Sequence, residues 1–233
     1  MTDPVVAPHS YARWRATTLG AITERAEAAV IFELAGALRG KRVLDVGTGD
    51  GGYAIEAATR GAVVTGLDED RAMLEAARAR AAERGVALAL VDGNAVALPF
   101  ADASFDVVLA VTVLCFVDDA GPAVRELARV LTPGGRLVIG ELARFSVWAT
   151  ERRVRGWLGA STWRRAHFWT RAELAALIRQ AGLRVNDDRG AVFFPPNAVV
   201  AHAMAPIEPL LASARAPGAA FLAFVAEKPT DRA

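Results

Sequence analysis

The residues best suited to ligand chemistry lie in one stretch, residues 43–52, with the sequence Val-Leu-Asp-Val-Gly-Thr-Gly-Asp-Gly-Gly. The apolar residues predict a buried strand with Asp45 inside it, followed by a glycine-rich turn. Glycines at positions 47, 49 and 51 let the backbone turn sharply and approach a bound molecule, because no Cβ stands in the way. A strand, a glycine turn and a helix in this order are typical of nucleotide-binding α/β folds.

Alternating strands and helices must position this turn. We expect apolar strands at residues 41–46, 62–67, 86–91, 104–111 and 136–140. Helices are expected at residues 11–38, from the glycine turn through residue 60, from the acidic residues 68–70 through residue 84, and at 119–131. A capping box, Thr170 to Glu173, predicts a helix to residue 181, and residues 183–186 and 221–226 are expected to be closing strands. The fold class is therefore α/β, a doubly wound, mostly parallel, seven-stranded, Rossmann-like sheet with helices on both faces and a lid.

The chain length fits a single domain over residues 1–233. Within it we expect an N-terminal helical lid (1–40), a cofactor-binding core (41–141), a substrate lid insertion (142–169) and a C-terminal helix with the closing strands (170–233). Residues 142–169 are rich in tryptophan and arginine and lack clear periodicity.

Four features fall at the carboxyl ends of the expected strands, where open α/β sheets bind ligands. They are the glycine turn, Asp68 after the second strand, the Gly93-Asn94-Ala95 segment after the third, and Thr112 after the fourth. A carboxylate at the position of Asp68 can accept hydrogen bonds from both hydroxyls of a ribose.

Four segments in this order and spacing resemble the class I S-adenosylmethionine-dependent methyltransferases, in the small-molecule group that includes quinone-ring methylases. They cover roughly residues 41 to 140 and read Val-Leu-Asp-Val-Gly-Thr-Gly-Asp-Gly, Gly-Leu-Asp-Glu-Asp-Arg-Ala-Met-Leu, Gly-Asn-Ala-Val-Ala-Leu-Pro-Phe-Ala-Asp-Ala-Ser-Phe-Asp-Val-Val and Arg-Val-Leu-Thr-Pro-Gly-Gly-Arg-Leu-Val-Ile. A looser match, Tyr-Ala-Arg-Trp-Arg-Ala-Thr-Thr-Leu-Gly from Tyr11, is similar to a segment that folds over the cofactor in related enzymes.

The resemblance implies S-adenosylmethionine as the cofactor. It implies that Asp45 and the glycine turn hold the methionine portion, that Asp68 binds the ribose diol, that Met73 packs near the adenine, and that Asn94 and Ala95 meet the adenine edge. Many relatives have Asp in place of Asn94, whose amide oxygen can still accept from the exocyclic amine. The full set of expected cofactor-binding residues is Tyr11, Asp45, Gly47, Thr48, Gly49, Gly51, Asp68, Glu69, Met73, Gly93, Asn94, Ala95 and Thr112.

Two alternatives stay open. Gly47, Gly49 and Gly52 also satisfy the G-x-G-x-x-G pattern of NAD(P)-binding Rossmann oxidoreductases. That hypothesis leaves Asp45 unexplained, because a carboxylate sits poorly beside a pyrophosphate, whereas a sulfonium cofactor with an ammonium group tolerates it. The second alternative is a non-catalytic family member that binds the cofactor or a partner without methyl transfer.

Catalysis is expected to be direct in-line displacement, in which alignment and desolvation supply much of the rate. His167 is the candidate general base; anchoring the lid is the competing role. The tryptophans and phenylalanines of the lid favour a small, partly aromatic or apolar acceptor, while their packing in a lid helix is the alternative. The lid arginines are expected to form a solvated helix face rather than to bind an anionic acceptor, and we expect no metal site.

Composition limits the remaining classes. A formal net charge of +1 gives no reason to expect nucleic acid or an anionic membrane as a partner. The single cysteine, Cys115, is expected to be a core residue and fits a reducing cytosol, so a cytoplasmic location is expected. No apolar run of about 20 residues is present, so membrane insertion is not expected. The sequence leaves a homodimer open.

Overall fold

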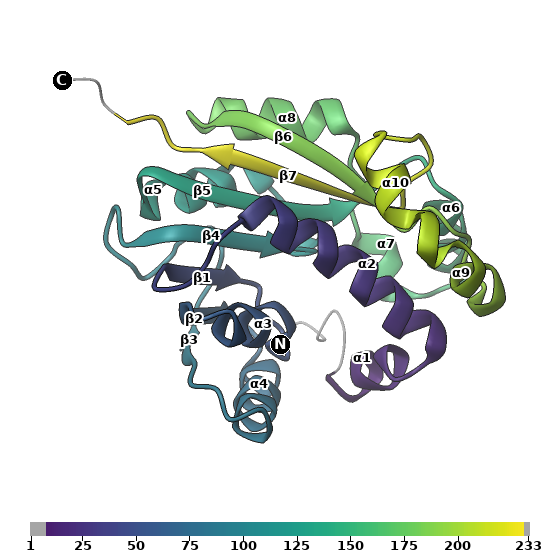
Figure 1. Ribbon diagram of the computed structural model, residues 1–233, viewed down its shortest axis with the longest axis horizontal. Helices are drawn as coiled ribbons and strands as arrows, with labels where there is room; N and C mark the ends of the chain where they lie inside the picture. Colours follow the sequence, from purple (N-terminus) through teal and green to yellow (C-terminus); the bar gives the residue numbers. More distant parts are fainter. Residues whose placement is uncertain (1–7, 231–233) are drawn as a thin grey trace.

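The computed structural model describes residues 8–230, without the side chains of residues 8–11 and 161. Its strands form one seven-stranded sheet in the order β3-β2-β1-β4-β5-β7-β6, drawn in Figure 1. Pairing is parallel from β3 to β5, and β7 is antiparallel to both of its neighbours. The strand bounds are β1 Arg42–Val46, β2 Val63–Asp68, β3 Ala89–Asp92, β4 Phe105–Val111, β5 Leu131–Leu142, β6 Arg184–Ala191 and β7 Phe221–Glu227.

Helices cover both faces of the sheet, each over its own apolar core. One core joins the sheet to α5 and α8, and the other joins it to α2 and α3, with α2 crossing in front of the sheet in Figure 1. The described helices are α1 Pro8–Arg15, α2 Thr18–Ala35, α3 Gly52–Thr59, α4 Arg71–Glu83, η1 Leu114–Phe116, α5 Ala120–Val130, α6 Val147–Trp157, α7 Ser161–Arg165, α8 Arg171–Gln180, α9 Ala198–Met204, η2 Ala205–Ile207 and α10 Glu208–Ser213. The expected doubly wound fold is thereby confirmed.

The carboxyl ends of the parallel strands share one edge of the sheet, on the right in Figure 1. The helices α6, α7, α9 and α10 gather at this edge. A backbone bridge between Ala143 and Trp169 closes the lid segment onto the end of β5. Short helices therefore cover the carboxyl edge of the sheet.

The short helices are the part of the fold that sequence periodicity missed. Residues 142–169 form α6 and α7, and the proline-rich segment between the closing strands contains α9, η2 and α10. Each of the helices α6 and α9 begins at a side-chain cap: Ser146 accepts from the N–H of Ala149, and Asn197 accepts from the N–H groups of Val199 and Val200. Few of their residues are buried, so the apolar stripe that would reveal a helix is short.

Several local predictions are confirmed. Thr170 and Glu173 form a reciprocal capping box at the start of α8. Cys115 is buried. Beyond these predictions, Asp106 is also structural, because its carboxylate accepts from the backbone N–H of Arg42 at 2.9 Å and pairs with the side chain of Arg42. The strand β5 begins earlier than expected, at Leu131, with an irregular register before Arg136.

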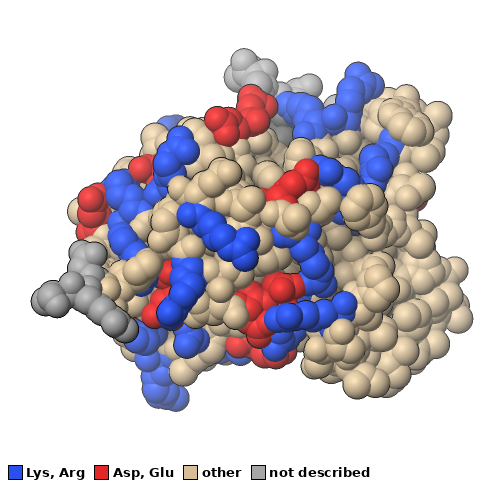
Figure 2. Space-filling view, turned by 90° about the horizontal axis from the view of Figure 1, so that it is seen from above, with Lys and Arg blue, Asp and Glu red and all other residues tan. Residues whose placement is uncertain are grey.

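The surface carries charges of both signs. Figure 2 shows Lys and Arg interspersed with Asp and Glu over the face that it displays, while the end where α9 and α10 lie is largely uncharged. Side chains such as Val199 and Leu210 are exposed there. None of the described helices combines the length and apolar character needed to cross a membrane.

The central strand gives a direct test of the core. Leu109 in β4 is fully buried, so Leu109→Ala should lower the free energy of unfolding by about 2–5 kcal/mol. Leu210→Ala is the matched control, because this leucine of α10 is 70% exposed and should change stability by less than about 0.5 kcal/mol. Urea unfolding followed by circular dichroism measures both, and equal losses would contradict the assigned core.

Candidate functional site

The glycine turn after β1 has the backbone that its sequence predicts. Gly47, Gly49 and Gly51 all have positive φ, at 68°, 54° and 82°. A Cβ on Gly47 would lie 2.6 Å from a methyl carbon of Val113, whereas a Cβ on Gly49 would meet no atom within 4 Å. Gly47 therefore permits close packing against the loop after β4, and Gly49 borders open space.

Asp45 supports this turn from within the sheet. Its side chain is buried, and Oδ2 accepts a hydrogen bond of 2.7 Å from the hydroxyl of Thr48. Burial raises the pKa of Asp45 to about 7, against the effect of hydrogen bonds from Thr48 and from the backbone of Ala54 at the start of α3. Asp45 thus joins β1, the turn and α3.

Asp68 connects the turn to the end of β2. Its Oδ2 accepts the N–H of Gly49 at 2.8 Å, and its Oδ1 accepts the N–H of Asp70 at 2.9 Å. Burial raises the pKa of Asp68, although these hydrogen bonds oppose the effect. Each carboxylate oxygen has a second lone pair, so Asp68 can accept two further hydrogen bonds, as a ribose diol requires.

The residues expected near an adenine form a second group beside Asp68. The N–H of Gly93 donates to the backbone oxygen of Asp68 at 3.1 Å. Asn94 donates through Nδ2 to Glu69 at 3.0 Å and accepts from the N–H of Val96 through Oδ1 at 3.0 Å. Its amide oxygen is thus already engaged once, with one lone pair left for a ligand. Of the other residues in this group, Ala95 is buried and Met73 is half-buried.

Thr112 ends β4 with a φ of 52°, in the left-handed region. Its N–H donates to Gly140 at 2.7 Å, and its hydroxyl donates to the oxygen of Val111 at 2.8 Å. Such strain in a non-glycine residue is common at functional sites. The four predicted features therefore lie along one edge of the sheet.

Sequence reasoning missed Asp50, which fastens α1 to the turn. Its buried carboxylate pairs with Arg15 of α1 at 2.6 Å and with Arg80 of α4 at 3.0 Å. These arginines come from elements distant in sequence, so no local pattern indicates the contact. Tyr11, expected to contact the cofactor, belongs to α1, but its side chain lies outside the described residues.

Glu141, at the end of β5, is a second group that the sequence did not reveal. It is fully buried, and Oε1 accepts the N–H of Leu114 in η1 at 2.7 Å. Its Oε2 has no partner among the residues that the structure describes. Burial raises the pKa of Glu141 to about 8 and raises that of the adjacent Cys115 thiol, to which the charge of Glu141 contributes.

His167 lies at the same end of the sheet, and its backbone N–H donates to the backbone oxygen of Cys115 at 2.8 Å. Nε2 of the exposed imidazole is 3.4 Å from a guanidinium nitrogen of Arg144, and the ring centroid is 4.2 Å from that of Trp169. Burial and Arg144 lower the pKa of His167, so the ring is neutral at pH 7. Because a guanidinium only donates, this contact requires Nε2 to be the acceptor, and it favours the anchoring role.

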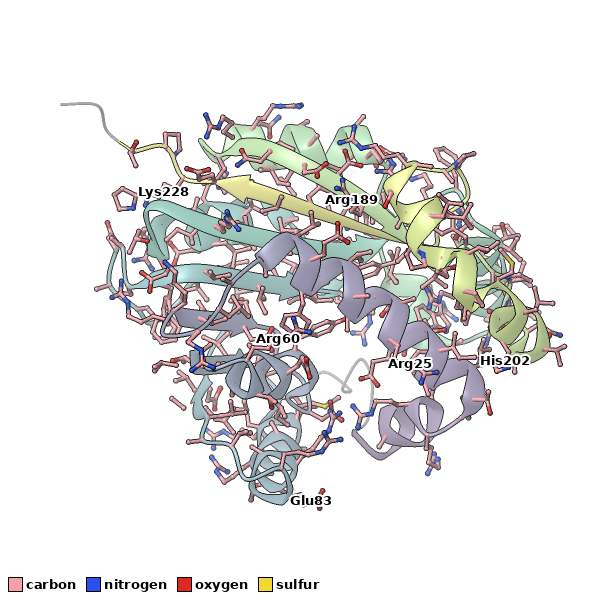
Figure 3. All side chains as sticks on the ribbon, viewed as in Figure 1. Arg25, Arg60, Glu83, Arg189, His202 and Lys228 are labelled. Carbon is pink, nitrogen blue, oxygen red and sulfur yellow. The ribbon has the colours of Figure 1, made fainter. Side chains whose placement is uncertain are left out.

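The lid aromatics divide between the core and the surface. Trp148 and Phe168 are buried, whereas Trp157 is 83% exposed. His202 is exposed on α9, at the far right of Figure 3. The described residues contain no group of three His, Cys, Asp or Glu side chains that could hold a metal ion.

Comparison with known proteins finds methyltransferases by both sequence and structure. Residues 44–139 match the family described as a methyltransferase domain. An uncharacterised protein of Mycobacterium tuberculosis is 39% identical over 153 residues, which cover 66% of this chain and 50% of that protein. An O-methyltransferase of Aspergillus nomiae is 39% identical over 131 residues, which cover 55% of this chain and 58% of that protein. This chain spans about half the length of the curated relatives that it matches.

Among solved structures, one from Thermotoga maritima matches with a TM-score of 0.72 at 25% identity. The match covers 94% of this chain and 95% of the other, which is described as an S-adenosylmethionine-dependent methyltransferase and possible histamine N-methyltransferase. These matches favour the sulfonium cofactor over the nicotinamide alternative, in agreement with the position of Asp45.

The buried carboxyl of Glu141 predicts a pH dependence of stability. Between its ordinary pKa of 4.5 and the raised value of about 8, the folded protein keeps a proton that the unfolded chain releases. The free energy of unfolding should therefore fall as pH rises through this window, by at most about 1.4 kcal/mol per pH unit from this group. Glu141→Gln should flatten the fall, measured by urea unfolding across the window.

Glu151→Gln is the matched control, because Glu151 on α6 is partly exposed and pairs with Arg155. This variant should keep the wild-type pH dependence. An unchanged slope in Glu141→Gln would contradict the assignment of a protonated, buried Glu141.

Proposed function

Since this chain belongs to the class I S-adenosylmethionine-dependent methyltransferases, we propose that it transfers a methyl group from this cofactor to a small-molecule acceptor. The observation that carries the proposal is the pairing of Asp68 with Gly49 beside open space. This arrangement leaves lone pairs on a fixed carboxylate next to a backbone that a ligand can approach. The domain match and the structural neighbour support the same class.

The residues present fit the cofactor that the family implies. Asp68 would hold the ribose diol, the turn from Gly47 to Gly51 would hold the methionine portion, and Asn94 with Ala95 would face the adenine. When bound, S-adenosylmethionine would supply an electrophilic methyl group, which the acceptor would attack in line so that S-adenosylhomocysteine leaves. The chain contributes position: Asp45, through Thr48 and α3, keeps the turn in one conformation, and α1 covers the turn through the Arg15–Asp50 pair. Such alignment can contribute on the order of 7–11 kcal/mol to catalysis.

The acceptor class is a narrower proposal. The fungal relative is named for oxygen methylation and the Thermotoga protein for nitrogen methylation, so a hydroxyl or an amine is the favoured nucleophile. The general-base role of His167 stays a prediction, beside the anchoring role that its contact with Arg144 favours.

Methyl transfer is tested with the full chain and cofactor labelled in the methyl group. Small phenols and arylamines should become labelled, and S-adenosylhomocysteine should accumulate in equal amount. Cofactor binding without transfer to any of these acceptors would contradict the proposal and favour the non-catalytic alternative.

Cofactor binding is tested separately by titration calorimetry. Asp68→Ala should weaken S-adenosylmethionine binding about tenfold or more, because hydrogen bonds to a charged group are lost. Asp92→Ala is the matched control, since Asp92 ends the neighbouring strand and pairs with the exposed Arg71. Equal affinity in Asp68→Ala and wild type would remove Asp68 from the site.

A further inference from the structure

Two arginines of α6 lie over aromatic rings: Arg153 over Phe168, with its guanidinium carbon 5.4 Å from the ring centroid, and Arg152 over two indoles. The guanidinium carbon of Arg152 on α6 lies over two indole rings, 5.0 Å from the ring centroid of Trp148 and 4.8 Å from that of Trp163. The expectation of a solvated arginine face is therefore wrong for Arg152, which is partly buried. Cations stack on aromatic faces in this way when they are withdrawn from water.

The N–H donors of Arg152 are not used within the described structure. On the same helix, Arg153 donates to the backbone oxygen of Arg144 and Arg155 pairs with Glu151. Arg152 forms no hydrogen bond or ion pair with any described residue. Contact with the two indole rings does not use the N–H donors of the guanidinium, so these donors are available to a ligand beside the indoles.

A carboxylate that likewise lacks a hydrogen-bond or ion-pair partner among the described residues lies on α2. Glu27 forms no hydrogen bond or ion pair among the described residues, yet it and Arg152 interact electrostatically. Burial raises the pKa of Glu27 to about 7, against the effect of Arg152. Glu33, farther along the same helix, is exposed and pairs with Arg189. Two ionisable groups, one acidic and one basic, are thus partly withdrawn from water without forming a direct pair.

Arg152 lies at the carboxyl edge of the sheet, and Trp148 beneath it packs in the same apolar core as α2, the helix that carries Glu27. The charge of Arg152 opposes the rise in the pKa of the Cys115 thiol that burial and Glu141 cause, so it acts on the first turn after β4. Trp163 packs with Cys115 and Phe168 in the apolar cluster at the end of β5. Trp148 donates through Nε1 to the oxygen of Phe194 at 2.8 Å and is fixed in place.

We propose that Arg152 and Glu27 together bind the methyl acceptor, which is therefore a small molecule with both a carboxylate and a proton-bearing hydroxyl or amine. The carboxylate is the ligand because the planar fork of Arg152 matches its two oxygens. Glu27 accepts a hydrogen bond from the proton-bearing group, and the indoles supply apolar surface beside it. This inference rests on the proposed function and narrows its substrate class.

The test measures binding to the full chain saturated with S-adenosylhomocysteine, by ligand-observed NMR titration. The probes are para-hydroxybenzoate and para-hydroxybenzyl alcohol, which differ in the anionic group. Wild type should bind the benzoate at least about tenfold more tightly than the alcohol. Arg152→Gln should abolish this preference and Arg155→Gln should keep it. Glu27→Ala should weaken both probes, while Glu33→Ala should not.

Three results overturn the inference: equal affinity of wild type for the two probes, no binding of either, or an unchanged preference in Arg152→Gln. Binding of S-adenosylhomocysteine to wild type is measured first, and its failure contradicts the proposed function instead. If Arg152→Gln does not fold, Arg152→Lys keeps the charge and the stem but removes the planar fork. Its preference for the benzoate should then be smaller than that of wild type, and an equal preference overturns the inference.

Discussion

The hydrogen bond from the N–H of Gly49 to the carboxylate of Asp68 is the contact on which the site depends. It joins the turn after β1 to the end of β2, so the ends of these two parallel strands form one continuous surface. The contact requires a left-handed backbone at Gly49, and the missing side chain keeps the space beside it open. A carboxylate fixed in this way is ready to bind a ligand without further ordering.

Buried carboxyl groups extend this support away from the turn. Asp45 holds the turn from within the sheet, Asp50 ties α1 and α4 to it, and Glu141 ties the end of β5 to η1. Burial raises the pKa values of Asp45 and Glu141 towards neutrality. A protein that withdraws acids from water in this way gives up stability at higher pH to keep its carboxyl edge in one conformation.

The backbone of the glycine turn and the placement of Asp68 beside it were predictable from the sequence because their determinants are local. The glycines, Asp45 and Asp68 belong to short motifs at the ends of apolar strands, and the capping box of α8 spans four residues. The acceptor side was not predictable to this degree. Arg152 and Glu27 come from helices far apart in the chain, and their withdrawal from water depends on packing between those helices. The helices α6 and α9 also bury too few residues to show a clear period.

The central claim is that the Gly49–Asp68 surface binds S-adenosylmethionine and its product S-adenosylhomocysteine rather than a dinucleotide. Titration calorimetry of the full chain with S-adenosylhomocysteine and, separately, with NAD tests it most directly. The account predicts saturable, one-to-one binding of S-adenosylhomocysteine and no heat of binding from NAD. Binding of NAD without binding of S-adenosylhomocysteine would contradict it.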